Sequence, residues 1–195
     1  METIKERTMS VYKFGNKKAD GRKELKNLLG GKGANLAEMS RIGIPVPPGF
    51  TITTEVCTQF NKEGKKAVVE KIDADVRAAI AEIEETMGAR FGDNENPLLI
   101  SVRSGARVSM PGMMDTVLNL GLNEDSIAGM TQKTGNERFV WDSYRRFIQM
   151  YSGVVLGLKP ENKEDLDPFE EIIDHLKEKR NIDLDTQFSV QDLQD

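Results

Sequence analysis

Residues 98–122 constrain the fold more than any other stretch of this chain. They begin and end as short apolar runs typical of strands, and between the runs lies a long segment. A connection whose only task is to join strands is usually short and turn-rich. This one carries Arg103, Arg107, Met110, Met113 and Met114. Arginines bind anions and methionines pack on flat rings, so one interpretation is a site for a ring-bearing anion. A long hairpin loop with its arginines in surface ion pairs fits the composition equally well.

The composition excludes several classes of protein. A chain of 195 residues can bury the core of one domain or of two small ones. Its net charge of −5 disfavours a general nucleic-acid or membrane-surface binder, and no stretch approaches the ~18 apolar residues that span a bilayer. Cys57 and His175 are the only residues of their kinds, which excludes a disulfide framework and a multi-histidine metal site. We therefore expect a soluble, cytoplasmic protein without a thiolate metal cluster.

A glycine-rich turn at residues 30–33 is the second candidate for anion binding. It precedes a predicted helix, where free backbone N–H groups favour an anion, and Lys32 adds a full positive charge. It is not a Walker A loop, because Lys32 is followed by Gly33 and not by serine or threonine. A tight turn with a solvated lysine is the alternative interpretation.

The rest of the N-terminal half alternates between strand and helix signals. Prolines keep residues 44–50 extended, and Thr54 is a natural N-cap. The assignments in chain order are an edge strand at 11–14, an exposed loop at 15–26, a helix after Gly33 that ends at Gly43, a strand at 51–53, a helix at 55–61 and an amphipathic helix at 68–89.

The C-terminal part is predicted to be all-helical from about Glu124. Asn123 is a helix cap, and residues 136–156 carry an aromatic stripe at helical spacing that is typical of a core. Asp167 is the predicted N-cap of a further helix. Ser189 begins another helix shortly before the sequence stops, so we expect the natural polypeptide to continue.

Four segments carry a resemblance to a known family. They are LLGGKGANLAEM, GIPVPPGFTITTE, SVRSGARVSMPGMMDTVLNLGL and WDSYRRFIQMYSGVV. In this order they resemble the N-terminal part of the pyruvate, phosphate dikinases. The related phosphoenolpyruvate synthases share the Gly-Gly-Lys and Val-Arg-Ser segments, but their loop continues differently from SMPGMMDT.

The resemblance implies an α/β (α+β) fold, namely part of an ATP-grasp domain over residues 1–122 with an inserted small helical subdomain over 123–195. Lys32 and Arg103 match the family's phosphate-contacting lysine and arginine, and are the residues expected to act in catalysis. Arg107, Gly112 and Met114 match its loop near the nucleotide.

Enzymes of this family convert ATP, pyruvate and phosphate to AMP, phosphoenolpyruvate and pyrophosphate through a phosphohistidine. The resemblance implies that the Mg²⁺ ligands, the phosphohistidine and the dimer-forming regions lie beyond Asp195. This chain alone is then expected to be an inactive fragment of a homodimeric enzyme, with neither nucleic acid nor membrane as a partner. A phosphoenolpyruvate synthase-like water dikinase and a non-catalytic docking or regulatory module are the alternatives.

Overall fold

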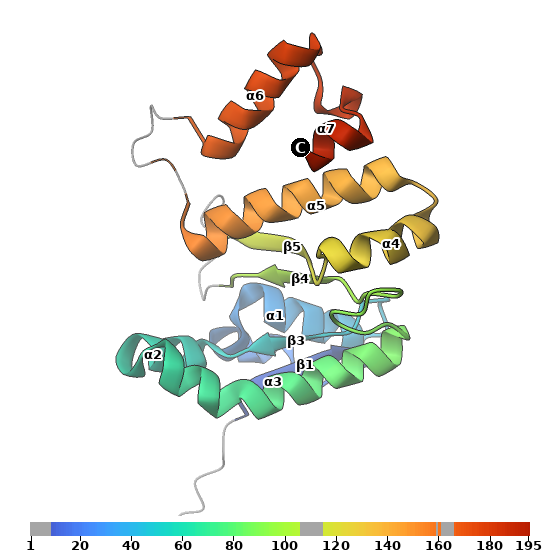
Figure 1. Cartoon of the computed structure of the whole chain (residues 1–195). Coiled ribbons are helices and arrows are strands. Elements are labelled where there is room, and N and C mark those ends of the chain that lie inside the picture. The colour runs from blue at the N-terminus through green and yellow to red at the C-terminus, as the bar shows by residue number, and fades with distance from the viewer. Residues whose placement is uncertain (1–8, 106–114, 159, 161–165) are drawn as a thin grey trace, which may run out of the picture. The chain divides into compact units, whose positions relative to one another are not determined.

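The chain divides into two compact units, and a computed structural model describes its residues 9–105, 115–158, 160 and 166–195. The first unit comprises residues 1–88 and 104–114, and the second comprises 89–103 and 115–195. Mixed helices and small sheets agree with the predicted α/β class (Figure 1). No helix in the described ranges has the length and apolar character that crossing a bilayer requires.

The sheet of the first unit has three antiparallel strands in the order β2-β1-β3. The strands are β1 (Val11–Gly15), β2 (Lys18–Ala19) and β3 (Gly49–Ile52). The predicted strand at 11–14 is confirmed, but its edge position is wrong. β1 is central because the proline-rich segment leads β3 along one side while β2 folds back on the other. The loop predicted at 15–26 is also wrong in part, since β2 and a 3₁₀ turn (Lys23–Leu25) lie within it.

Three helices complete the first unit: α1 (Lys26–Arg41), α2 (Thr54–Glu63) and α3 (Lys65–Met87). α1 and α3 lie on opposite sides of the strands (Figure 1). Ala37 on α1 and Ala79 on α3 are both buried, which lets each helix approach the sheet closely. The amphipathic helix predicted at 68–89 is confirmed with shifted bounds. α1 begins earlier than the predicted start after Gly33.

The second unit starts with an antiparallel pair of strands and continues as helices. Its elements are β4 (Ile100–Arg103), β5 (Thr116–Leu120), a 3₁₀ turn (Glu124–Ser126), α4 (Ile127–Thr134), α5 (Glu137–Tyr151), a π-helical turn (Ser152–Leu156), α6 (Pro168–Arg180), a 3₁₀ turn (Asp185–Gln187) and α7 (Val190–Gln194). The two strands predicted within 98–122 and the helical character after them are confirmed. Leu122, Ile127 and Val140 form a buried cluster beneath Trp141 and Tyr144.

Helix starts were the most predictable local feature. The Asn123 side chain accepts from the Ser126 N–H at 2.9 Å, the Asp167 carboxylate accepts from the Phe169 N–H at 2.9 Å, and Ser189 forms a capping box with Asp192. The Thr54 prediction is wrong by one position, because Thr53 is the N-cap. The Thr54 hydroxyl instead donates to the Asn27 carbonyl at 2.8 Å.

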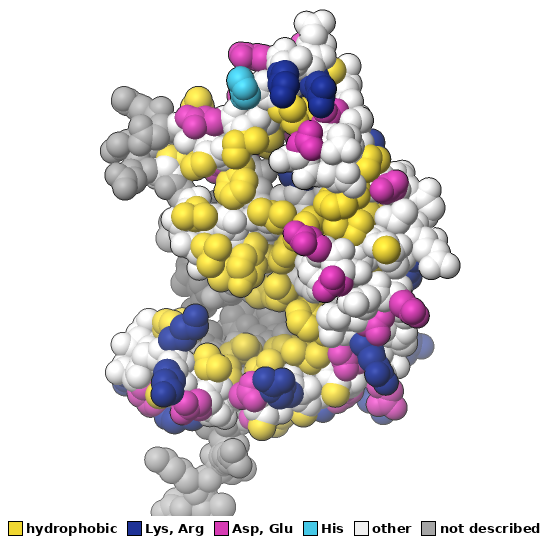
Figure 2. All heavy atoms as spheres, viewed as in Figure 1, with side chains coloured by type: hydrophobic (Ala, Val, Ile, Leu, Met, Phe, Trp, Pro, Cys, Tyr) yellow, Lys and Arg dark blue, Asp and Glu magenta, His cyan; other side chains and the backbone are white. Residues whose placement is uncertain are grey.

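The aromatic stripe on α5 is only partly a core. Val140 is 1% exposed, and Trp141 meets Tyr144 edge to face with ring centroids 6.1 Å apart. Phe139 remains 52% exposed and Ile148 is also exposed, which corrects the prediction that the whole stripe is buried. Hydrophobic side chains accordingly gather at the surface over the helices of this unit (Figure 2).

The compact units do not divide at the predicted boundary of residue 122. Residues 89–103 and 115–122 group with the helical part because β5 packs against α5 and Leu122 belongs to the buried cluster. The division into 1–122 and 123–195 concerns an ATP-grasp domain and its insertion, and it stays a prediction.

Candidate functional site

The described residues include two of the five predicted site residues. Lys32 lies on α1 in the first unit, and Arg103 ends β4 in the second unit. The predictions for Arg107, Gly112 and Met114 fall outside the described residues. The candidate site therefore consists of two separate pieces, namely the segment around Lys32 in the first unit and the end of β4 in the second unit.

The helix that carries Lys32 is broken by a glycine two residues before it. Gly30 has φ 70° and ψ 170°, a conformation that is essentially restricted to glycine. The break separates residues 26–29 from a new helical segment in which Lys32 lies in the first turn. The N–H groups at such a start lack regular helical partners, so they and the Lys32 ammonium are suited to an anion. This agrees with the glycine turn and helix start inferred from sequence.

Two contacts fix this segment within the first unit. Gly33 is buried against β3, where an added Cβ would lie 2.7 Å from both the hydroxyl oxygen and the methyl carbon of Thr51. The Thr54 hydroxyl donates to the Asn27 carbonyl, which ties the start of α2 to the first turn of α1. The backbone before and after the break at Gly30 is thus held from two sides.

The Lys32 ammonium remains available for a ligand. It donates to the Ser104 carbonyl at 3.5 Å, a long and therefore weak hydrogen bond. The side chain is partly exposed, and an ammonium has three donors. A phosphate oxygen could therefore be bound without breaking a strong internal contact.

Arg103 projects from the end of an exposed strand. It pairs with Thr116 across the antiparallel ribbon of β4 and β5, and its side chain is exposed. The register of this ribbon shifts between Ile100 and Val102, which marks a β-bulge. A guanidinium in this position can bind a phosphate through two parallel hydrogen bonds.

A tight loop anchors the beginning of β4. The Leu98 N–H donates to the Arg90 carbonyl at 2.7 Å. The Asp93 carboxylate accepts from the N–H groups of Asn96 (2.7 Å) and Glu95 (2.8 Å), and these two bonds hold the pKa of Asp93 below its usual range. The loop is therefore fixed by its own backbone before the strand begins.

Helix α4 supports the same loop from outside it. The Lys133 ammonium donates to the Asn96 side-chain oxygen at 2.7 Å. At Gly129 the helix passes so close to the loop that an added Cβ would lie 2.2 Å from the Asn94 carbonyl oxygen. Neither this support nor the bulge was predicted from the sequence. Glycine within the helical pattern of α4 and asparagine within the strand pattern of β5 were the available signals.

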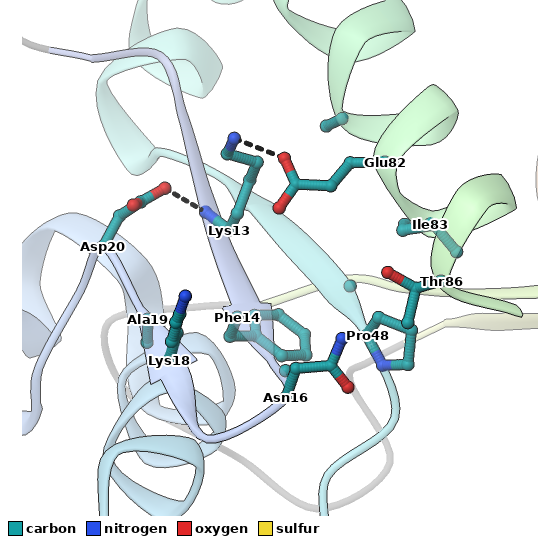
Figure 3. A pocket seen from close by; sticks show the side chains of 13 residues that line it. Lys13, Phe14, Asn16, Lys18, Ala19, Asp20, Pro48, Glu82, Ile83 and Thr86 are labelled. Atoms are coloured by element: carbon teal, nitrogen blue, oxygen red, sulfur yellow. Dashed lines mark hydrogen bonds and ion pairs between the residues drawn. The ribbon is translucent and has the colours of Figure 1, made fainter.

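The first unit also has a pocket of about 530 Å³ that involves neither predicted residue. It lies between the β1–β2 hairpin and α3 (Figure 3). The Lys13 ammonium and the Glu82 carboxylate pair across it at 2.5 Å, and this hydrogen bond raises the pKa of Lys13. The ring of Phe14 packs on Gly49, where an added Cβ would lie 2.7 Å from the ring. The Lys13 ammonium is already paired with Glu82, and the pocket includes neither Lys32 nor Arg103, so we do not assign the phosphate site to it.

Comparison with known proteins covers both pieces. The sequence model of the family described as "Pyruvate phosphate dikinase, AMP/ATP-binding domain" matches residues 26–77 and 65–147. Similar proteins include the pyruvate, phosphate dikinase of Clostridium symbiosum, which is 51% identical over 185 residues, covering 95% of this chain and 20% of that protein. The chloroplastic pyruvate, phosphate dikinase 1 of Zea mays is 49% identical over all 195 residues, covering 19% of that protein.

A dikinase of Rhizobium meliloti (strain 1021) is 50% identical over 179 residues, covering 92% of this chain and 19% of that protein. The chain thus spans about a fifth of the length of the curated relatives that it matches. Lys32 and Arg103 both fall within the matched residues. The chain belongs to the pyruvate phosphate dikinase family, and its residues 26–147 match the family's AMP/ATP-binding domain.

Proposed function

We propose that this chain forms part of the ATP site of a pyruvate, phosphate dikinase. The observation that carries the proposal is the family match over residues 26–147, because it includes both Lys32 and Arg103. The reaction we propose for the full protein converts ATP, pyruvate and phosphate to AMP, phosphoenolpyruvate and pyrophosphate through a phosphohistidine. We assign the phosphohistidine and the pyruvate site to regions outside this chain, and we expect the isolated chain to be inactive.

In this proposal the chain contributes positioning and electrostatic stabilisation. Lys32 supplies a compact charge and Arg103 a planar fork, and together they bind the oxygens of the triphosphate. Charge that develops on these oxygens during phosphoryl transfer is stabilised by cations already held in place. Arg107, Gly112 and Met114 belong to the same proposal as the loop near the nucleotide.

Mg²⁺ is part of the family chemistry that we expect, but the described residues do not fit such a site. Within residues 9–105, 115–158, 160 and 166–195, no group of three or more His, Cys, Asp or Glu side chains could hold a metal ion. We therefore propose that the Mg²⁺ ligands lie beyond Asp195.

The finer architecture belongs to the proposal as well. We propose that residues 1–122 are the first part of an ATP-grasp domain and that 123–195 are its helical insertion. The Gly30 break before Lys32 and the all-helical run after β5 support this division. We propose that the full protein is a cytoplasmic homodimer whose interface is formed by regions outside this chain.

The test is the ATP-dependent half-reaction of a full-length protein that carries this chain. We expect Arg103→Ala and Lys32→Ala each to lower its kcat/KM by about 100-fold or more, since each removes a charge that stabilises the transferred phosphoryl group. Arg77→Ala is the matched control. Arg77 is an exposed arginine on α3, and its ion pair in the described part of the chain is with Asp73, one turn earlier on the same helix.

The result for Arg103 decides the proposal. An Arg103→Ala protein that retains the half-reaction within a few-fold of wild type contradicts it. Transfer of the second phosphoryl group to water in place of phosphate would reassign the protein to the phosphoenolpyruvate synthase-like alternative. Phosphoenolpyruvate formation by the 195-residue chain alone would contradict the assignment of the remaining sites to other regions.

A further inference from the structure

A β-bulge lies between the anchored end of β4 and Arg103. Ile100 is opposite Leu120, but Val102 is opposite Val117 and Arg103 is opposite Thr116. Two residues of β5 therefore face one residue of β4: Leu118 and Asn119 lie across from Ser101. A bulge of this kind bends a strand and changes the direction of the side chains beyond it.

The backbone of Asn119 holds the bulge. Its φ is 58°, in the left-handed region that asparagine tolerates better than most residues other than glycine. The Leu122 N–H donates to the Asn119 carbonyl at 3.0 Å, which closes a turn directly after the bulge. The extra residue is thus held by a backbone conformation that few side chains allow.

The bulge determines which residue of β5 shares a face of the ribbon with Arg103. Residues directly opposite one another project to the same face of an antiparallel pair. With the bulge, Arg103 shares its face with Thr116, while the buried Val117, 5% exposed, shares the other face with Val102. If the register of Ile100 and Leu120 continued unbroken, Arg103 would lie opposite Val117. An unbroken register would therefore bring Arg103 and Val117 to the same face, so that either Val117 would lose its burial or the cation would lie on a buried face.

The start of the ribbon cannot easily absorb such a shift. Leu98 is buried, and its N–H is bonded to the Arg90 carbonyl. Gly121 has φ 111° and lies so close to Leu98 that an added Cβ would be 2.6 Å from the Leu98 carbonyl oxygen. With this end fixed, the bulge sets the register at the other end, where Arg103 lies.

We propose that Asn119 is a positioning residue for Arg103, because its left-handed backbone holds the bulge that keeps the guanidinium and the buried Val117 on opposite faces of the ribbon. The proposal rests on the proposed function, in which Arg103 binds the triphosphate of ATP. Asn119 acts through the register of the ribbon and makes no contact with ATP in this scheme.

The test compares three variants of the full-length protein in the ATP-dependent half-reaction, with rates normalised to the folded fraction measured by circular dichroism. Asn119→Val places a β-branched residue where φ is positive and favours a regular strand. We expect it to raise the KM for ATP and to lower kcat/KM by about 100-fold, the size of effect that misplacing a catalytic group by about 1 Å produces. Asn119→Gly permits the same backbone, so we expect kcat and KM within about twofold of wild type.

Asn181→Val is the matched control. Asn181 ends α6 with φ 53°, so this substitution imposes a similar strain in the same unit but away from the ribbon. We expect it to lower the folded fraction without changing the KM for ATP. Where Asn119→Val does not fold, Asn119→Ala replaces it, because alanine strains the same backbone less.

Two results would overturn the proposal. One is a folded Asn119→Val or Asn119→Ala protein with wild-type KM and kcat. The other is an Asn119→Gly protein as defective as Asn119→Val, which would assign the effect to the amide and not to the backbone. Arg103→Ala, assayed in parallel, separates the two proposals. If it is inactive while the Asn119 variants are normal, only the positioning role fails; if it is active, the proposed function fails and the positioning role with it.

Discussion

In the first unit, Lys32 follows a break in helix α1. The break has a backbone conformation that is essentially restricted to glycine, and the helical segment that carries Lys32 packs on β3. In the second unit, Arg103 ends a strand whose side-chain direction depends on a partner strand and on a loop held by α4. The break in the first unit is local, because it is made by the backbone of Gly30 itself, although Thr51 and Thr54 hold the segment around it. The arrangement in the second unit depends on residues far away in the sequence. Lys133, which supports the loop before β4, is about 30 positions from Arg103.

This difference determines how each cation can be displaced. Lys32 should move when its own backbone is forced out of the break. Arg103 should move when residues that never approach it change the loop or the register. Three substitutions test the comparison, in order of decreasing expected effect on the free energy of unfolding.

Gly129→Ala is expected to be the most damaging. The new methyl carbon would lie 2.2 Å from the Asn94 carbonyl oxygen and 2.6 Å from the Glu95 carbonyl oxygen, both of them backbone atoms. Either α4 or the loop before β4 must move, and overpacking of this kind costs about 3 kcal/mol. Chemical denaturation of wild type and variant measures the difference.

Lys133→Ala is the control for that experiment. It removes the hydrogen bond to the Asn96 side chain without adding any atom between helix and loop. We expect a loss of about 0.5 kcal/mol, because the contact is exposed. Equal losses for the two variants would show that the hydrogen bond, and not the close approach at Gly129, holds the loop.

Gly30→Ala is the corresponding test of the first unit. A Cβ at φ 70° and ψ 170° is strongly disfavoured, so we expect a loss of about 2 kcal/mol. Gly31→Ala is the matched control one residue later, where the nearest atom to an added Cβ is the Lys26 Cε at an ordinary 3.7 Å. A change from glycine to alanine in a helix there should be neutral or stabilising by up to about 1 kcal/mol. Similar losses at both positions would contradict a break confined to Gly30.

The same contrast explains what could be predicted from sequence. The caps at Asn123, Asp167 and Ser189 were predicted because a cap is a property of four consecutive residues. A glycine turn at residues 30–33 was predicted for the same reason, but the helical residues before Gly30 and the helical position of Lys32 were not. Secondary structure within residues 98–122 followed from apolar runs on either side of the central segment.

Features that depend on pairing could not be derived in this way. The central place of β1 is decided by β3, which arrives after a whole helix and a proline-rich segment. The bulge at Asn119 is decided by how β4 pairs with β5, and the role of Gly129 by a loop about 35 residues earlier. Partial exposure of the α5 stripe likewise depends on which neighbours cover the helix.

The third substitution concerns the far end of the second unit, where ion pairs of Asp185 connect two helices. The Asp185 carboxylate accepts from the Lys177 ammonium at 2.8 Å and from the Arg145 guanidinium at 3.2 Å, so it links α6 and α5. The hydrogen bond from Lys177 is the main cause that lowers the pKa of Asp185, and the charges of Lys177, Arg145 and Arg146 lower it further. Lys13 and Glu82 of the first unit are more exposed, so their pair is screened more strongly.

Asp185→Asn should therefore destabilise the chain by about 1 kcal/mol near pH 7. A carboxyl whose pKa is lowered on folding stabilises the fold above its unfolded pKa of about 3.9, and this stabilisation is lost as the pH falls through the folded value. The difference between wild type and variant should be constant from about pH 5 to neutrality and should shrink below about pH 4. Urea denaturation across this pH range measures the difference in the free energy of unfolding.

Asp174→Asn is the control. The Asp174 carboxylate is 3.9 Å from the Lys177 ammonium but 61% exposed, so the substitution should change the free energy of unfolding by no more than about 0.3 kcal/mol. A difference that persists undiminished in acid would mean that the side chain at position 185 acts through its hydrogen-bonding geometry and not through its charge, because the Asp185 backbone carbonyl, which accepts from Arg138 at 2.7 Å, is present in both proteins.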